Sequence, residues 1–232
     1  MEWIVGPCGW ESKENISEFG FELAELGIRN IRGGIWKYRS KKDTYQGDGD
    51  LLLTLIDHSM FNINYFVEVF DEEQLNSVAP HFCIQVGSRN MHNTNLLKKI
   101  NELSKTHGKL TVMLKRNYMA SLGEFVDHSK YLSDCNVIMC LRGIFGLFPY
   151  EQRFQPDVTD IQRLRELTDN KICYDVSHSG CEARFVPNLI KCAKVYNPEY
   201  IMVEVHPDPL NARSDAQQQL TIEEFKDILG KG

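Results

Sequence analysis

The chain alternates between short apolar runs and longer segments in which apolar residues recur at helical spacing. Short runs rich in apolar and β-branched residues are typical of strands buried on both faces, as in a parallel sheet covered by helices. We therefore expect eight strands, at residues 2–8, 30–36, 64–70, 82–88, 110–116, 137–143, 171–177 and 200–206.

The segments between most of these runs have the spacing of amphipathic helices. In the first of them Ile16, Phe19 and Leu23 recur every three or four residues, which places them on one helical face. Comparable patterns predict helices over residues 14–26, 95–103 and 221–230, the last of them stopped by a glycine.

Repeated strand–helix units predict a single domain over residues 1–232, folded as a (β/α)8 TIM barrel. An open doubly wound sheet has the same alternation. However, no Gly-x-Gly-x-x-Gly follows any strand, which disfavours the dinucleotide-binding form of that fold. The longest irregular stretch, residues 144–156, follows the sixth strand and is a candidate substrate loop.

Composition and charge exclude several classes of partner. The 232 residues carry a formal net charge of −6, so the chain lacks the basic surface of a nucleic-acid-binding protein. No apolar run approaches the ~18 residues of a membrane span. The first strand begins too close to the N-terminus to leave room for a signal peptide, and the seven cysteines form no Cys-x-x-Cys pair. We therefore expect a cytoplasmic enzyme with reduced thiols.

Residue types that bind metal ions gather where the predicted strands end. The eighth strand ends in Glu204 and His206, which point to the same face because they are two residues apart. A lone buried cysteine or histidine is more typical of core packing or of a structural hydrogen bond. Active sites of such barrels, however, lie at the carboxyl ends of the strands. There the chain offers a candidate divalent-metal site formed by Cys8, His178, Glu204 and Asp215.

The same edge of the predicted barrel carries many positive charges in a chain that is acidic overall. The cations at or after the strand ends are Arg32, Lys37, Arg39, Arg89, Lys115 and Arg142. Each one alone is most often a solvated loop residue. Together they exceed the needs of one phosphate, and they favour two anionic substrates or one substrate with several anionic groups.

Seven ordered motifs resemble those of the metal-dependent synthases that condense phosphoenolpyruvate with a phosphorylated sugar aldehyde. The best known are 3-deoxy-arabino-heptulosonate 7-phosphate synthase, which opens the shikimate pathway to aromatic amino acids, and 3-deoxy-manno-octulosonate 8-phosphate synthase. The motifs are Gly6-Pro7-Cys8 with Glu11-Ser12, Arg32-Gly33-Gly34 with Lys37-Tyr38-Arg39-Ser40-Lys41, Gln85 to Met91, Leu114-Lys115-Arg116, Arg142-Gly143-Ile144, Asp175 to Ser179, and Glu204 to Pro209 with Ser214 to Gln218. The Lys-x-Arg-Ser spacing resembles the heptulosonate branch more than the octulosonate branch.

This resemblance implies roles for individual residues. Cys8, His178, Glu204 and Asp215 would bind a divalent metal such as Mn, Fe, Co or Zn. The anionic groups of phosphoenolpyruvate would be held by Arg32, Arg89, Lys115 and Arg142, and the phosphate of the aldose by Arg39 and Ser40. Lys37 would act near the reacting carbonyl, and His206 is a further catalytic candidate. Additional substrate contacts are expected from Glu68, Gln85, Ser88 and Asp175.

The implied reaction joins phosphoenolpyruvate to an aldose phosphate, with erythrose 4-phosphate as the expected acceptor, and releases inorganic phosphate. The resemblance also implies a homodimer or homotetramer and a bare catalytic barrel without a regulatory domain. Two alternative functions are that of a related synthase that uses a different aldose phosphate and that of a catalytically silent barrel that binds phosphorylated ligands. Intact metal ligands argue against the silent barrel.

The chain departs from the family pattern at several positions. Leu141 replaces a glutamate next to Arg142, and Tyr38 replaces a proline whose ring would fix the backbone. The remaining departures are Asn117, Phe145 and the stretch Cys181-Glu182-Ala183. The predicted metal and phosphoenolpyruvate residues are complete while the aldehyde side is altered, so the hypothesis is a conserved condensation with a changed acceptor.

Overall fold

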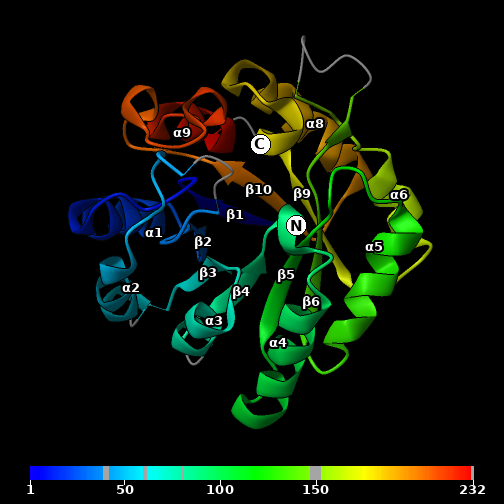
Figure 1. Ribbon diagram of the computed structural model, residues 1–232. Helices are drawn as coiled ribbons and strands as arrows, with labels where there is room; N and C mark the ends of the chain where they lie inside the picture. The colour runs from blue at the N-terminus through cyan, green and yellow to red at the C-terminus, as the bar shows by residue number, and fades with distance from the viewer. Residues whose placement is uncertain (39–41, 60–61, 80, 147–152, 231–232) are drawn as a thin grey trace.

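Eight parallel strands close into a barrel in the computed structural model, which describes residues 1–38, 42–59, 62–79, 81–146 and 153–230 (Figure 1). The strands are β1 (Glu2–Gly6), β2 (Asn30–Arg32), β3 (Asn64–Val69), β4 (Cys83–Val86), β5 (Thr111–Lys115), β6 (Asn136–Leu141), β9 (Lys171–Asp175) and β10 (Tyr200–Glu204). They follow this order around the barrel, and β10 pairs with β1 to close it. The predicted TIM barrel is confirmed, and closure excludes the open doubly wound sheet.

Helices surround the strands on the outside of the barrel (Figure 1). They are α1 (Gly20–Glu25), α2 (Leu52–Ser59), α3 (Glu72–Val78), α4 (Thr94–His107), α5 (Leu122–Ser129), α6 (Asp160–Arg165), α7 (Val176–Gly180), α8 (Val186–Tyr196) and α9 (Ile222–Gly230). The predicted helix over residues 95–103 is α4. It begins after Asn93, whose side chain accepts the N–H of Leu96 at 3.1 Å, and it ends at Gly108, where φ is 88°.

The first predicted helix, over residues 14–26, is present in two parts. A π-helical turn, Asn15–Phe19, leads directly into α1. Ile16, Phe19 and Leu23 are all buried, so the apolar face predicted from their spacing is confirmed. The wider π turn could not be read from a pattern that has the period of an α-helix.

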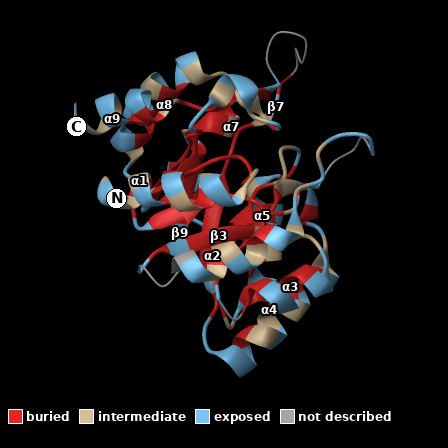
Figure 2. Cartoon of the chain, turned by 90° about the vertical axis from the view of Figure 1, so that its left-hand side faces the viewer, coloured by how far each residue is buried: buried red, intermediate tan, exposed pale blue. Residues whose placement is uncertain are grey.

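Apolar side chains pack in two layers, and the strands are the most buried part of the chain (Figure 2). A small cluster that includes Ile4, Phe66, Met113 and Met202 forms one layer. The larger cluster, which includes Val5 and residues of the surrounding helices, forms the layer between strands and helices. Neighbouring strand residues such as Ile4 and Val5 fall in different layers because their side chains point to opposite faces.

The segment after β6 is more regular than predicted. Ile144–Phe145 (β7) and Phe154–Gln155 (β8) pair as a short antiparallel ladder, so the expectation of an irregular stretch over residues 144–156 is wrong at its two ends. Two-residue strands are too short to show an alternating pattern in the sequence. Residues 147–152, between the two strands, lie outside the described residues.

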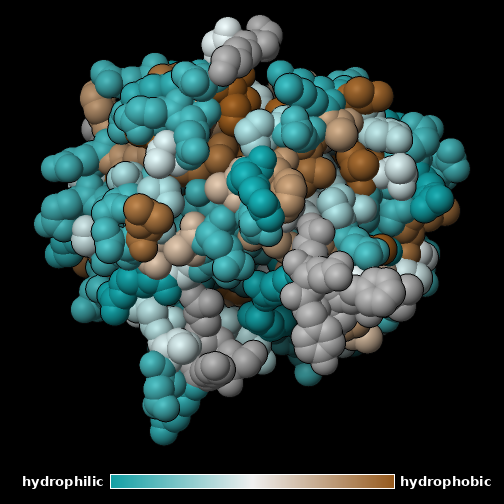
Figure 3. Space-filling model, turned by 90° about the horizontal axis from the view of Figure 1, so that it is seen from above, coloured by the Kyte–Doolittle hydropathy of each residue, from teal (hydrophilic) through white to brown (hydrophobic). Residues whose placement is uncertain are grey.

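Hydrophilic side chains cover most of the face seen from above, and hydrophobic ones form separate patches between them (Figure 3). Within the described ranges, no helix is both long and apolar enough to cross a lipid bilayer.

Candidate active site

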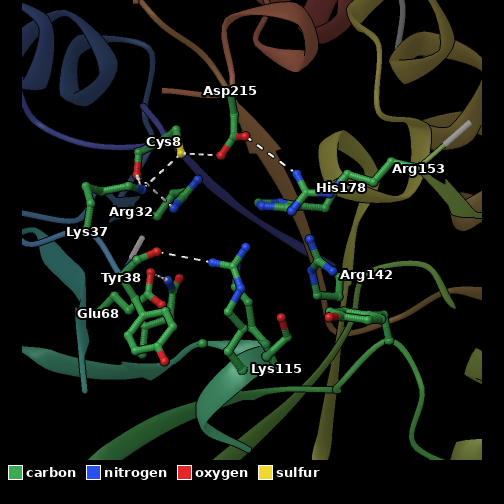
Figure 4. A pocket seen from close by; sticks show the side chains of 15 residues that line it. Cys8, Arg32, Lys37, Tyr38, Glu68, Lys115, Arg142, Arg153, His178 and Asp215 are labelled. Carbon is green, nitrogen blue, oxygen red and sulfur yellow. Dashed lines mark hydrogen bonds and ion pairs between the residues drawn. The ribbon is translucent and has the colours of Figure 1, made fainter. Parts of the chain in front are cut away.

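A polar pocket lies at the carboxyl ends of the barrel strands, where the sequence predicted the chemistry (Figure 4). It is lined by Cys8, Arg32, Lys37, Tyr38, Glu68, Gln85, Gly87, Ser88, Arg89, Lys115, Tyr118, Arg142, Arg153, His178 and Asp215. The barrel therefore brings together, from strands far apart in the sequence, most of the residues predicted to bind metal or substrates.

Two predicted residues lie behind the pocket wall rather than in it. Asp175, at the end of β9, and Glu204, at the end of β10, are fully buried and contact residues that line the pocket. They support the wall through these contacts. The predicted aldose-phosphate residues Arg39 and Ser40 lie outside the described residues.

His206 is directed to a different neighbourhood. Its Nδ1 accepts the backbone N–H of Asp208 at 3.0 Å, and its Nε2 lies 3.7 Å from the carboxylate of Glu11. β10 ends at Glu204, and the backbone N–H of His206 then donates to Leu220 at 2.9 Å. His206 is absent from the described pocket lining, so its position favours a role in anchoring the segment after β10.

Cys8 and Asp215 meet at one end of the pocket. The Cys8 Sγ lies 3.1 Å from Asp215 Oδ2, and the Cys8 backbone N–H donates to Gln219 Oε1 at 2.9 Å. Lys37 Nζ lies 3.0 Å from the Cys8 Sγ and 2.8 Å from its carbonyl oxygen. Burial, reinforced by the charge of Glu204, raises the pKa of the Cys8 thiol to about 12. The thiol is therefore protonated here and donates to Asp215.

His178 is held in place by the residue that ends β9. The Asp175 carboxylate accepts the backbone N–H of His178 at 3.0 Å, which caps the short helix α7. His178 Nδ1 lies 2.8 Å from Asp175 Oδ2 and 3.8 Å from Glu204 Oε1. Burial lowers the pKa of His178 despite these two carboxylates, so the imidazole is neutral, the form that binds metal ions.

Glu204 is the most enclosed of the predicted metal ligands. Its carboxylate forms a buried ion pair with Arg32 and accepts the Gln218 side chain at 2.5 Å. Its backbone N–H donates to Ser177 Oγ at 2.8 Å. Burial opposes ionisation of Glu204, yet the positive charge of the paired Arg32 guanidinium lowers its pKa below the ordinary value, so it is a carboxylate.

The four predicted metal ligands are neighbours in two contacting pairs. Cys8 touches Asp215 at 3.1 Å, and His178 lies 3.8 Å from Glu204, separations that ligands of one metal ion can share. A thiol, an imidazole and two carboxylates form a donor set suited to several transition metals. Among the described residues, no three or more of these side chains are arranged as a finished metal cluster. Their chemistry fits a metal, while the side chains still point to protein partners.

The cations of the pocket fall into two groups. Arg32 and Lys115 are already paired, with Glu204 and with Asp175, whose Oδ2 lies 3.0 Å from Lys115 Nζ. Arg89 and Arg142 have no carboxylate partner within the described ranges; Arg89 donates to the Tyr38 carbonyl at 3.1 Å. Arg142 is buried, and its Nη1 has no hydrogen-bond partner in the same part of the chain.

Gly87 allows the Glu68 side chain to lie close to the backbone at the end of β4. A Cβ on Gly87, which follows β4, would lie 2.0 Å from Glu68 Oε1. The absence of a side chain at Gly87 therefore permits Glu68 to reach Gln85, whose Nε2 donates to Glu68 Oε2 at 3.5 Å. This contact connects the ends of β3 and β4 below Ser88 and Arg89.

Tyr118 and Arg153 line the pocket and were missed in the sequence. Tyr118 follows the predicted Lys115-Arg116 motif, but its residue type carries no distinct signal there. Arg153 lies in the predicted substrate loop, where nothing in the local pattern separates it from an ordinary surface arginine. Its Nη1 lies 3.7 Å from Asp215 Oδ1, a contact that only the folded barrel reveals (Figure 4).

Comparisons with a family profile and with known sequences identify the same family. Residues 1–231 match the profile of the DAHP synthetase I family. The chain is 33% identical to the phospho-2-dehydro-3-deoxyheptonate aldolase of Thermotoga maritima over 97% of this chain and 67% of that protein. It is 26% identical to the 2-dehydro-3-deoxyphosphooctonate aldolase of Fusobacterium nucleatum, over 97% of this chain and 87% of the relative.

Solved structures agree with the sequence comparison. The crystal structure of the Thermotoga maritima phospho-2-dehydro-3-deoxyheptonate aldolase matches 100% of this chain and 68% of its own, with a TM-score of 0.90 and 31% identity. A truncated 3-deoxy-D-arabino-heptulosonate 7-phosphate synthase from the same organism matches with a TM-score of 0.87 and 30% identity, over 100% of this chain and 84% of its own. The resemblance drawn from the sequence motifs is confirmed: the chain belongs to the DAHP synthetase I family.

Proposed function

We propose that this protein condenses phosphoenolpyruvate with an aldose phosphate, with erythrose 4-phosphate as the expected acceptor, to give 3-deoxy-arabino-heptulosonate 7-phosphate and inorganic phosphate. The observation that carries the proposal is the pocket itself. It joins Arg89 and Arg142, which have no carboxylate partner in the part of the chain that the structure describes, to a wall that contains Cys8, His178 and Asp215. Such a pocket suits a reaction between two phosphorylated substrates beside a metal ion.

The protein's own residues would hold the substrates in reacting positions. Arg89 and Arg142 would bind anionic groups of phosphoenolpyruvate, together with Lys115 and Arg32, which are positioned by ion pairs with the buried carboxylates of Asp175 and Glu204. Cations fixed in place before the reaction stabilise negative charge as it develops. Burial opposes the charge of Lys37, yet its pKa lies above the ordinary value because the Glu68 carboxylate is near. Lys37 therefore remains protonated and can donate a proton to the aldehyde oxygen.

The bond changes balance with these two substrates and one water molecule. The methylene carbon of phosphoenolpyruvate attacks the aldehyde carbon, and a carbon–carbon bond forms. Water adds at C2 of the former enol, and the C2–O bond to phosphate then breaks and releases inorganic phosphate. Cys8, His178, Glu204 and Asp215 would hold the divalent metal, which would supply Lewis-acid polarisation of the aldehyde.

The departures from the family pattern differ in how they bear on the acceptor. Leu141 is fully buried in the apolar layer between strands and helices, away from the pocket. Asn117 donates to the Ser88 carbonyl at 3.1 Å, and Phe145 lies on the short strand β7. Tyr38, in contrast, lines the pocket and is held edge-on by Phe70, with ring centroids 5.7 Å apart.

Tyr38 therefore favours a second candidate, a related synthase that accepts a different aldose phosphate. Its ring occupies part of the wall between Lys37 and Arg89, next to the residues expected to contact the aldose. A bulky ring at this position restricts the size or shape of the acceptor more directly than any other departure in the described chain. The reaction with phosphoenolpyruvate is the same in both candidates.

A phosphate-release assay tests the proposal and separates the two candidates. Purified protein, supplied with phosphoenolpyruvate and with Mn, Fe, Co or Zn in turn, is tested with a panel of three- to five-carbon aldose phosphates. Turnover with erythrose 4-phosphate equal to or better than every alternative would reject the altered acceptor. A Lys115→Met variant serves as the control with reduced activity. Absence of phosphate release with every metal and aldehyde would reject the condensation and favour a silent, ligand-binding barrel.

A further inference from the structure

We propose that Arg142 and Arg153 form a two-guanidinium site for the phosphate of phosphoenolpyruvate, organised on the ring of Phe154. The inference rests on the proposed function and extends it to two residues, Arg153 and Phe154, to which neither the motifs nor the comparisons give a role. Arg153 would contact the phosphate directly, and Phe154 would act as a positioning residue for both arginines.

The first observation is the stacking of both guanidinium groups on one ring. The Cζ of Arg142 lies 4.3 Å from the centre of the Phe154 ring, and the Cζ of Arg153 lies 4.8 Å from it. Both distances are typical of cation–π contacts, which restrict the orientation of a guanidinium plane. Figure 4 shows Arg142 and Arg153 on the same side of the pocket, next to His178.

Phe154 is well placed to hold this arrangement because it is itself fixed. It is 3% exposed, pairs with Phe145 across the β7–β8 ladder, and packs against the Tyr118 ring with centroids 5.4 Å apart. Close packing continues at Gly143, where an added Cβ would lie 3.1 Å from the Phe154 Cβ. The ring is therefore a rigid support beside the pocket rather than a mobile loop side chain.

The second observation is the charge balance of the two arginines. Arg142 is buried without a carboxylate partner, and its Nη1 makes no hydrogen bond within the described residues. Among the described residues, the one carboxylate that Arg153 contacts is Asp215, at 3.7 Å, which the proposed function assigns to the metal. Burial is the largest cause of the lowered pKa of Arg142; the charge of Asp175 opposes it, and the charge of Arg153 lowers the pKa further. Two neighbouring cations of this kind repel each other until an anion lies between them.

A phosphate dianion is the ligand that this pair fits best. Guanidinium groups present paired N–H donors that match phosphate oxygens, and a dianion balances two positive charges. Arg142 is already expected to contact phosphoenolpyruvate, so the phosphate of that substrate, and the inorganic phosphate that leaves, is the assigned occupant. The phosphate of the aldose could bind the same pair of arginines, and the KM values for the two substrates distinguish these ligands.

Steady-state kinetics of the metal-loaded enzyme test the direct contact. Arg153→Gln should raise KM for phosphoenolpyruvate about tenfold, as expected for the loss of a charge-assisted hydrogen bond at a half-exposed site, and leave KM for the aldose phosphate unchanged. Arg153→Lys keeps the positive charge but loses the paired N–H donors of the guanidinium, so its KM for phosphoenolpyruvate should lie between those of the wild type and Arg153→Gln. An unchanged KM for phosphoenolpyruvate, or an increase confined to the aldose phosphate, would overturn the assignment.

The chain contains a matched control. Arg184 stacks on the adjacent Phe185 with its Cζ 4.6 Å from the ring centre, but it is exposed, pairs with Glu182 and does not line the pocket. Arg184→Gln should leave both KM values unchanged. The supporting ring is tested separately. Phe154→Leu should raise KM for phosphoenolpyruvate and leave kcat unchanged, whereas Phe154→Tyr, which keeps an aromatic ring, should have the KM of the wild type. Equal defects in the leucine and tyrosine variants would overturn the positioning role.

A binding measurement separates failure of this inference from failure of the proposed condensation. Isothermal titration of phosphoenolpyruvate into wild type and Arg153→Gln requires no aldehyde and no turnover. Weaker binding in the variant supports the two-arginine site even if no aldehyde releases phosphate, a result that would reject the condensation alone. Equal binding by both proteins overturns the site even if the wild type is an active synthase.

Discussion

Replacing Arg116 with methionine should destabilise the barrel by removing the centre of a buried charge cluster. The Arg116 guanidinium lies 2.7 Å from Asp160 Oδ2 and 3.3 Å from Asp157 Oδ2, and its Nε donates to the Ala120 carbonyl at 3.0 Å. Asp157 is fully buried and also accepts the backbone N–H of Gly143 at 2.8 Å. The cluster thereby ties the segment after β8 to the ends of β5 and β6.

The magnitude follows from what the substitution leaves behind. Removing one partner of a buried ion pair costs about 3–5 kcal/mol because the remaining charge is uncompensated. The lower end applies here, since Asp157 keeps the Gly143 N–H as a donor. A loss of about 3 kcal/mol in the free energy of unfolding lowers Tm by about 6–12 °C for a chain of this size.

The effect should depend on pH through Asp157. Burial, the largest cause, raises the pKa of Asp157 to about 6 in the folded protein, above its ordinary value of 3.8. A group with a raised folded-state pKa contributes stability that is complete below the unfolded pKa and is lost as the pH rises through the folded one. Removal of Arg116 raises the folded pKa further, so the stability difference between variant and wild type should widen as the pH rises above about 6.

Thermal denaturation followed by circular dichroism measures both effects. The matched control is Arg163→Met, because Arg163 binds the other oxygen of Asp160 at 2.8 Å but is 68% exposed. That exposed pair should contribute less than about 1 kcal/mol. A similar decrease in Tm for Arg116→Met and Arg163→Met, or a loss in Arg116→Met that does not grow with pH, would refute the reasoning from burial.

The remaining predictions concern two pocket residues and one glycine that packs against the core. Cys8→Ala should lose the divalent metal while keeping its far-UV spectrum; metal analysis by mass spectrometry checks this, and equal metal content in both proteins would contradict the ligand assignment. Lys115→Met leaves the buried Asp175 without its cation, so kcat/KM for phosphoenolpyruvate should fall at least about tenfold, measured by phosphate release. Gly33→Ala places a Cβ 2.3 Å from the Trp10 Nε1, so urea denaturation should show a loss of about 1–3 kcal/mol.

The barrel could be predicted from the sequence because its strands are buried on both faces. Short continuous apolar runs bounded by turn residues, such as the one ending in Glu204, are typical of strands buried on both faces. The β7–β8 ladder could not be predicted, since two residues show no period. The π turn before α1 was also hidden, because Ile16, Phe19 and Leu23 satisfy the spacing of an ordinary helix.

The location of the site was predictable for a related reason. Residues at the carboxyl ends of parallel strands must gather at one end of a closed barrel, so polar side chains there identify the pocket before any contact is known. The pairing of those side chains was not predictable. Arg32 and Arg142 look equivalent in the sequence, yet one is neutralised by Glu204 and the other has no carboxylate partner in the described chain. Arg153 enters from a loop and carries no positional signal.

The departures from the family pattern show how strand geometry decides which substitution matters. Successive residues of β6 alternate between the two apolar layers: Cys140 belongs to the small cluster with Met113, and Leu141 packs in the layer under the helices. A change at position 141 therefore acts on packing behind the wall, although the sequence places it next to Arg142. Tyr38 follows β2 in a loop without such alternation, and its ring reaches the pocket beside Arg89. Any change of acceptor is therefore expected to originate at Tyr38 and not at Leu141, even though both depart from the same family pattern.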